Sequence, residues 1–135
     1  MIDRNKQLEL IKAALEVRDK AHAPYSHFKV AAALLCKDGD IVAGINVESS
    51  SYGLSVCAER NTIATAVAQG KKEFTAMAVV SKGGVTPCGA CRQVIFDVCG
   101  PIDIILADES GKICDSMNIT ELLPKAFSDK DLGQV

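Results

Sequence analysis

Three cysteines and one glutamate have the residue types and spacings that suit a metal ion engaged in chemistry. Cys57 and Glu59 stand two positions apart, and Cys88 and Cys91 form a Cys-x-x-Cys pair further along the chain. Thiolates at such spacings are typical zinc ligands, and a zinc ion with three protein ligands keeps a fourth position for water. Glu59 follows a ligand closely enough to take a proton from that water and to pass it to a substrate. The pattern therefore predicts a catalytic zinc site with three cysteine ligands and a proton-transferring glutamate.

A structural zinc site is the alternative for the same cysteines. Such sites use four protein ligands, and the fourth would be Cys36, Cys99, His22 or His27. Cys99 follows Cys91 in one predicted helix and lies roughly 12 Å further along its axis, at about 1.5 Å per residue. An open fourth position fits the spacing better. The alternative, a non-catalytic zinc-stabilised interaction module, predicts four protein ligands and no exchangeable water.

Two arginines stand close after the proposed ligands. Three thiolates leave a zinc centre with one net negative charge, which weakens its ability to acidify water. A cation at the start of a helix is mildly unfavourable, so Arg60 and Arg92 at such positions indicate specific contacts. We predict that Arg60 donates to the cysteine sulfurs and offsets the excess charge, and Arg92 is a second candidate for the same role.

The predicted secondary structure places both ligand groups at the starts of helices. Helices are expected over residues 4–21, 57–69 and 88–99, with a short capped helix near 118–123, and strands over 30–36, 41–47, 74–80, 101–107 and 112–115. This order predicts an α/β fold, a three-layer α-β-α sandwich with a mixed five-stranded sheet. Helical crossovers between the later strands place the starts of the second and third helices at one edge of the sheet, where the cysteines can converge. Val67 and Val98 are expected on the buried faces of these helices.

Length, composition and charge limit the number of domains, the class of partner and the expected location of the chain. A length of 135 residues, with 48% hydrophobic and 24% charged residues, predicts one folded domain over residues 1–135. The net charge of −2 gives no basic surface for a polynucleotide. No apolar run approaches the ~20 residues that span a bilayer, and the polar N-terminus lacks a signal-peptide pattern, so a cytoplasmic location is expected. The cysteines are then expected to be reduced, with Cys36, Cys99 and Cys114 as small buried hydrophobic residues.

The sequence resembles the small homo-oligomeric cytidine deaminases over nearly its whole length. The paired Cys-x-Glu and Pro-Cys-x-x-Cys spacing is close to the known signature of zinc-dependent deaminases. The resemblance implies a cytidine deaminase-like fold and a homotetramer with active sites shared between subunits and one Zn²⁺ per subunit. It also implies hydrolytic deamination of cytidine and 2′-deoxycytidine to the uridine nucleosides and ammonia, in pyrimidine salvage. The stretches that carry it are residues 23–28, 46–48, 51–53, 57–60, 87–93 and 121–127.

The resemblance also assigns substrate contacts. Asn46 and Glu48 match the family residues that hold the ribose 3′-hydroxyl, and an amide and a carboxylate suit sugar hydroxyls. Phe28 matches a residue that packs against the pyrimidine ring. Ala58 matches a residue whose backbone N–H meets the carbonyl of the base.

Three further residues match family positions that act on a neighbouring subunit. Ser50 and Tyr52 match residues that reach the 5′ end of a neighbour's nucleoside, and Phe127 matches a tail aromatic that closes a neighbour's pocket. Ala31 and Ser49 depart from the family pattern, which often has glycine and asparagine there. Both could alter local packing or the subunit contact, although neither touches the proposed chemistry.

Two other substrate classes are weighed against a free nucleoside. A relative that acts on another aminopyrimidine, such as blasticidin S, remains an alternative, but the Asn46 and Glu48 pair and Phe127 favour an ordinary nucleoside. A polynucleotide is disfavoured because the chain lacks a basic surface and a pocket closed by the tail would exclude a strand. Cytidine and 2′-deoxycytidine stay equal candidates.

Overall fold

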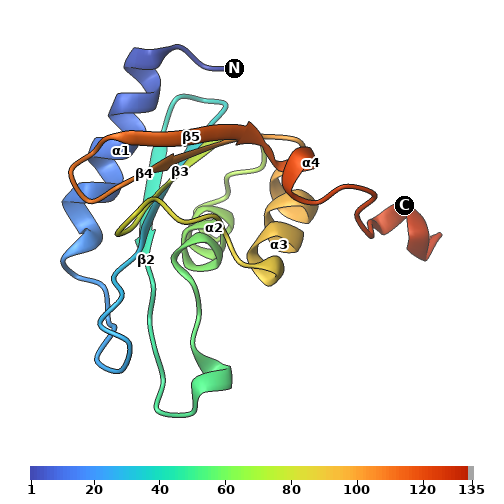
Figure 1. Cartoon of the computed structure of the whole chain (residues 1–135). Coiled ribbons are helices and arrows are strands. Elements are labelled where there is room, and N and C mark those ends of the chain that lie inside the picture. The colour runs from blue at the N-terminus through green and yellow to red at the C-terminus, as the bar shows by residue number, and fades with distance from the viewer. Residues whose placement is uncertain (134–135) are drawn as a thin grey trace.

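Five strands form one mixed sheet in the order β2-β1-β3-β4-β5, as the computed structural model shows for residues 1–133, the part of the chain that it describes (Figure 1). β1 pairs antiparallel with both β2 and β3, β3 pairs parallel with β4, and β4 pairs antiparallel with β5. The predicted mixed five-stranded sheet is therefore confirmed. The strands are β1 (Ala31–Cys36), β2 (Ile41–Ile45), β3 (Phe74–Val80), β4 (Asp103–Ala107) and β5 (Ile113–Asn118).

Helices cover both faces of this sheet and complete three layers. Leu10 and Ile11 of α1 pack on one face with the odd-numbered residues of β1, whereas Ile63 of α2 and Ile95 of α3 pack on the other with the even-numbered ones. All six β1 side chains are buried, as expected for a central strand between two cores. In residues 1–133, no helix has the length and apolar character needed to cross a membrane. The helices are α1 (Arg4–Arg18), α2 (Ala58–Ala68), α3 (Gly89–Cys99) and α4 (Ile119–Leu122), with 3₁₀ turns η1 (Tyr52–Leu54) and η2 (Asp129–Leu132).

The element boundaries differ most from the prediction at the ends of α1 and β5. α1 begins after the Asp3 cap, whose carboxylate accepts from the Lys6 amide at 2.8 Å. It ends at Arg18 instead of residue 21. The amides of Lys20 and Ala21 bond to carbonyls three residues back, not four as in an α-helix, and His22 then forms a β-bridge with Val47. β5 continues to Asn118, which pairs with Asp103. Its polar outer residues face solvent at the edge of the sheet, so they carry no apolar signal.

Three predicted burials are corrected by the structure. Cys36 is buried and Cys99 is half-buried, but Cys114 is exposed because it lies on the edge strand β5. Val67 and Val98 are 52% and 39% exposed. Each is next to the buried positions of its helix in the helical repeat but is not itself buried.

An arm between β2 and α2 leaves the sheet and returns to it. It projects below the body of the molecule in Figure 1 and carries η1. Two backbone hydrogen bonds between Val47 and Val56 close its base. The Asn61 side chain of α2 donates to the Ile45 carbonyl at 2.8 Å and fastens the helix start to the end of β2. The fold thereby fixes where α2 begins, and with it the position of Cys57.

Gly44 allows β2 to lie directly against α2. A Cβ at this position would lie 2.5 Å from Thr62 Oγ1 and 3.0 Å from the Thr62 amide, and Thr62 Oγ1 is itself held by the Ala58 carbonyl at 2.7 Å. We expect Gly44→Ala to lower the free energy of unfolding by about 1–3 kcal/mol through overpacking, as measured by denaturant titration. Gly53→Ala is the matched control, because its Cβ would meet no atom within 4 Å. Equal unfolding free energies for the two variants would contradict this account of the β2–α2 contact.

Candidate metal centre and substrate cavity

The three predicted cysteine ligands converge at the starts of two helices. Cys57 is the N-cap of α2 and Cys88 is the N-cap of α3, with Cys91 in the first turn of α3. Their Sγ atoms all lie within 4.8 Å of one another. The Sγ atoms of Cys57 and Cys88 are 3.8 Å apart, and those of Cys88 and Cys91 are 3.4 Å apart.

This cluster fits a zinc ion with three protein ligands. Zn–S bonds of about 2.3 Å in a tetrahedron place the sulfurs about 3.8 Å apart, close to the observed separations. The N-cap thiols accept no hydrogen bond from their own helices, and free N–H groups and the helix dipole favour thiolates there. Within residues 1–133 the cluster contains these three cysteines alone, so none of the four candidates for a fourth ligand belongs to it.

The cluster distributes negative charge unevenly. A hydrogen bond with Cys91 holds the pKa of the Cys57 thiol at about 5, and contacts with Arg60 and Cys88 act in the same direction. The same bond, together with burial, raises the pKa of Cys91. The first thiolate therefore forms at Cys57, and a metal held by the three cysteines would displace the remaining thiol protons.

The two arginines behave differently. An Nη of Arg60 donates to Cys57 Sγ at 3.8 Å, and the hydrogen bonds to Cys57 and Cys91 raise the pKa of Arg60. Arg92 donates instead to the carbonyls of Pro87 and Leu122 and to Thr86 Oγ1, at 2.8, 3.0 and 3.1 Å. The prediction that Arg92 donates to the cysteine sulfurs is wrong, because its three guanidinium nitrogens donate to the loop before Cys88 and to the end of α4.

Glu59 lies beside the cysteines in a buried position. It occupies the first turn of α2 and is only 4% exposed. Burial raises the pKa of Glu59 to about 7, and the Cys57 charge adds to this effect while Arg60 opposes it. A carboxyl group with a pKa near neutrality can both accept and donate a proton at neutral pH.

A cavity of about 300 Å³ joins Glu59 to most of the predicted substrate contacts. This volume is at the lower end of the roughly 300–1,000 Å³ typical of ligand pockets. The lining is mainly apolar with few polar groups, as expected for a small organic ligand. Predicted residues in the lining are Phe28, Asn46, Glu48, Cys57, Ala58, Glu59 and Cys88; those that were not predicted are Ser26, Val30, Val79, Val85 and Thr86.

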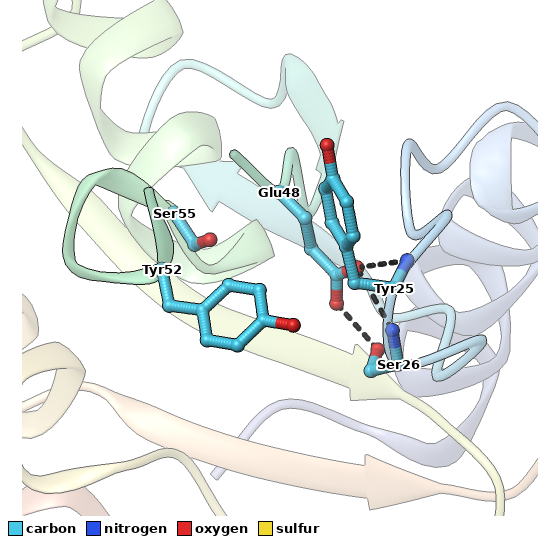
Figure 2. A pocket seen from close by; sticks show the side chains of 5 residues that line it. All are labelled: Tyr25, Ser26, Glu48, Tyr52 and Ser55. Carbon is cyan, nitrogen blue, oxygen red and sulfur yellow. Dashed lines mark hydrogen bonds between the residues drawn. The ribbon is translucent and has the colours of Figure 1, made fainter. Parts of the chain in front are cut away.

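Asn46 and Glu48 also organise the loop that carries Phe28. The Asn46 amide nitrogen donates to the Phe28 carbonyl at 2.9 Å, and its oxygen accepts from the Val30 amide at 3.0 Å. Figure 2 shows the Glu48 carboxylate accepting from the Tyr25 and Ser26 amides, both at 3.1 Å, and from the Ser26 hydroxyl. The Ser26 hydroxyl bond is the main reason that the pKa of Glu48 lies below its usual range.

Ser50, Tyr52 and Phe127 lie outside the cavity that contains Glu59. Tyr52 is 73% exposed and lines a neighbouring outer cavity of about 270 Å³ with Tyr25, at a ring separation of 5.8 Å. Ser50 is exposed on the arm. Phe127 is 57% exposed beside a separate hollow, and its carbonyl accepts from Gln93 at 2.8 Å. The three residues predicted to act on a neighbouring subunit are therefore those that do not line this chain's own cavity.

Comparisons with known proteins point to one family. The family model described as "Cytidine and deoxycytidylate deaminase zinc-binding region" matches residues 4–106. A cytidine deaminase of Halalkalibacterium halodurans is 46% identical over 92% of this chain and 96% of its own length. A blasticidin-S deaminase of Bacillus cereus is 31% identical over 91% of this chain and 93% of its own. The crystal structure of cytidine deaminase from Burkholderia pseudomallei superposes with a TM-score of 0.85 at 43% identity, covering 93% of this chain and 100% of that one.

Proposed function

Because the chain belongs to the cytidine and deoxycytidylate deaminase family, we propose that it hydrolyses cytidine and 2′-deoxycytidine to the uridine nucleosides and ammonia, in pyrimidine salvage. The observation that carries the proposal is a buried carboxyl group, Glu59, in a cavity that is also lined by two of the three convergent thiols, Cys57 and Cys88. One zinc ion per subunit, held by Cys57, Cys88 and Cys91, would supply the Lewis acid that makes water acidic enough to react near neutral pH.

Glu59 moves the protons in the proposed reaction. It accepts a proton from the attacking water and delivers it to N3 of the cytosine ring while the water oxygen bonds to C4. It then takes the second proton of that oxygen and gives it to the amino group as the C4–N bond breaks. The two protons of the water thus finish on N3 and on ammonia, and its oxygen becomes the new carbonyl. A pKa near neutrality suits a group that performs both transfers.

The other cavity residues have proposed binding roles. Phe28 packs against the ring, and the Ala58 N–H at the start of α2 meets the base carbonyl. Asn46 and Glu48 take the sugar hydroxyls with the donor and acceptor capacity that their loop contacts leave free. Arg60 offsets the charge of the thiolates.

The charges around the cavities favour a nucleoside over a nucleotide. The described residues that line the inner and outer cavities include Glu48 and Glu59 but no lysine or arginine. A 5′-phosphate carries a charge of about −1.5 to −2 and would find no cationic partner among these lining residues. Within a family whose model covers both cytidine and deoxycytidylate deaminases, the charges therefore support the unphosphorylated substrate.

A substrate panel tests the proposal. The zinc-loaded protein is incubated with cytidine, 2′-deoxycytidine, CMP, cytosine and blasticidin S, and conversion is followed by the ultraviolet change. We expect both nucleosides to react and kcat/KM for CMP to be at least about 100-fold lower than for cytidine, because an unpaired buried charge costs several kcal/mol. Equal use of CMP, or preference for blasticidin S, would overturn the substrate assignment.

A homotetramer with shared sites completes the proposal. The exposure of Tyr52 and Phe127, both large aromatic residues, supports a role for them at subunit contacts. In this arrangement Ser50 and Tyr52 reach a neighbour's nucleoside, and Phe127 closes a neighbour's pocket.

A further inference from the structure

The loop that carries Phe28 is hydrogen-bonded through its backbone to Asn46 and Glu48, the two residues proposed to contact the sugar. Glu48 accepts from the amides of Tyr25 and Ser26, and Asn46 bonds to the backbone on both sides of Lys29. These bonds exist in the free chain. The groups proposed to recognise the sugar and the ring proposed to pack on the base therefore belong to one connected structure.

Ser26 occupies the central position in this structure. Its hydroxyl donates to Glu48 Oε2 and accepts from the Phe28 amide at 3.0 Å, which uses the single donor and one of the two lone pairs of a serine. Figure 2 shows the hydroxyl directed at the carboxylate. Ser26 and Glu48 are also the two residues that line both the inner and the outer cavity. The hydroxyl thus stands in the wall between the cavities and joins the carboxylate to the backbone of the aromatic residue.

The backbone between Ser26 and Phe28 shows why such a link is needed. His27 has a φ of +58°, the left-handed region that residues with a side chain rarely adopt. Its amide donates to the Ala23 carbonyl at 3.0 Å, and the Ser26 hydroxyl holds the next amide in the chain. The loop keeps this unfavourable conformation because hydrogen bonds on both sides of His27 fix it.

We propose that Ser26 is a positioning residue that couples Glu48 to Phe28, so that the sugar end and the base end of the cavity are set together. The expected effect on cytidine binding rests on the proposed function. The link from Glu48 through Ser26 to Phe28 is a property of the free chain and does not depend on that function. Without the hydroxyl, Glu48 keeps its two backbone donors and stays in place, but Phe28 loses the bond that ties it to Glu48. The effect therefore falls on binding, since neither Glu59 nor the cysteines share a hydrogen bond with Glu48 or Phe28 within residues 1–133.

Steady-state kinetics of Ser26→Ala test the proposal. We expect KM for cytidine to rise about tenfold, with kcat changed less than about threefold; tenfold corresponds to about 1.4 kcal/mol, the size of one lost bond to a charged group. Ser26→Thr, which retains a hydroxyl, should restore KM to within about threefold of the wild type. Ser116→Ala on β5 is the matched control, because the Ser116 hydroxyl makes none of the hydrogen bonds found among residues 1–133.

The coupling is tested by a double-mutant cycle with Glu48→Ala. If Ser26 acts through Glu48, Ser26→Ala should change KM by less than about twofold when Glu48 is already absent. The same tenfold effect in both backgrounds would show that Ser26 acts independently and would overturn the proposal.

Amide hydrogen exchange separates this proposal from the proposed function. In the free protein, exchange of the Phe28 amide should be at least about tenfold faster in Ser26→Ala than in the wild type or Ser116→Ala, because the amide loses its acceptor. Unchanged exchange at Phe28 overturns the coupling whatever the substrate. Failure of the wild type to deaminate cytidine overturns the proposed function and leaves the exchange result to decide the coupling.

Discussion

Replacing Glu59 by glutamine is expected to lower kcat for cytidine by roughly 10³- to 10⁴-fold, the upper range for loss of a general acid–base group. The amide has nearly the same shape as the carboxyl group but accepts no proton from water. Because Glu59 is proposed to perform both proton transfers, neither step keeps its catalyst. The cavity itself should be preserved, since a buried group with a pKa of about 7 is replaced by a neutral one of equal size.

Zinc content and kinetics together separate lost chemistry from lost structure. Glu59 does not belong to the cysteine cluster, so Glu59→Gln should bind as much zinc as the wild type and should unfold at a similar temperature. Glu109→Gln is the matched control, because Glu109 lies exposed in the turn between β4 and β5. Ammonia release by Glu59→Gln at the wild-type rate would remove Glu59 from the mechanism.

The second large effect is expected from Cys91→Ala. Cys91 is fully buried and its Sγ lies within the cluster, so its loss leaves two protein ligands for the metal. We expect zinc content after dialysis to fall more than about tenfold and cytidine turnover to fall with it, because zinc affinity depends on the full ligand set. The melting temperature should also drop, since a metal that binds only the folded chain stabilises it.

Cys99→Ala provides the matched control on the same helix. Cys99 is half-buried at the other end of α3, where burial raises the pKa of its thiol to about 12. It lies outside the cluster, so zinc content and turnover should stay at the wild-type level. Loss of zinc in both variants would instead indicate a structural site with Cys99 as its fourth ligand, and zinc retained in Cys91→Ala would contradict the proposed ligand set.

The convergence of the three cysteines was predictable from sequence for two physical reasons. Cys88 and Cys91 stand one helical turn apart, so they face the same side. The rule that parallel strands joined by a helix cross over in one hand places the starts of α2 and α3 at one edge of the sheet. Short-range spacing and chain topology together therefore predict the convergence of the three thiols.

The features of the site that the sequence does not predict are side-chain hydrogen bonds to distant backbone groups. Such bonds produce no periodic pattern in the sequence. Asn46 was assigned to the sugar through a resemblance, yet its hydrogen bonds to the backbone of Phe28 and Val30 leave no pattern in the chain. The role of Ser26 was missed for the same reason, although it lies within a stretch that carries the resemblance. Arg92, like Arg60, stands close after a cysteine, but its side chain donates to two backbone carbonyls and to Thr86 Oγ1 instead.

The prediction of burial is wrong for residues whose neighbours in sequence differ from their neighbours in space. Cys114 lies among residues with strand-like character, but β5 is an edge strand and its outer residues are solvated. Val67 shows the same limit on a helix, because apolar periodicity does not reveal how far burial extends around the helix.

Deamination of cytidine in oxygen-18 water by the zinc-loaded protein tests the central claim most directly. The claim is that water, deprotonated with the help of Glu59 beside a cysteine-held zinc ion, replaces the amino group of a free cytosine nucleoside. We predict one ammonia for each cytidine consumed and uridine that carries the heavy oxygen at C4, as measured by mass spectrometry. Cytidine that is not consumed, or uridine without the label, would contradict the account.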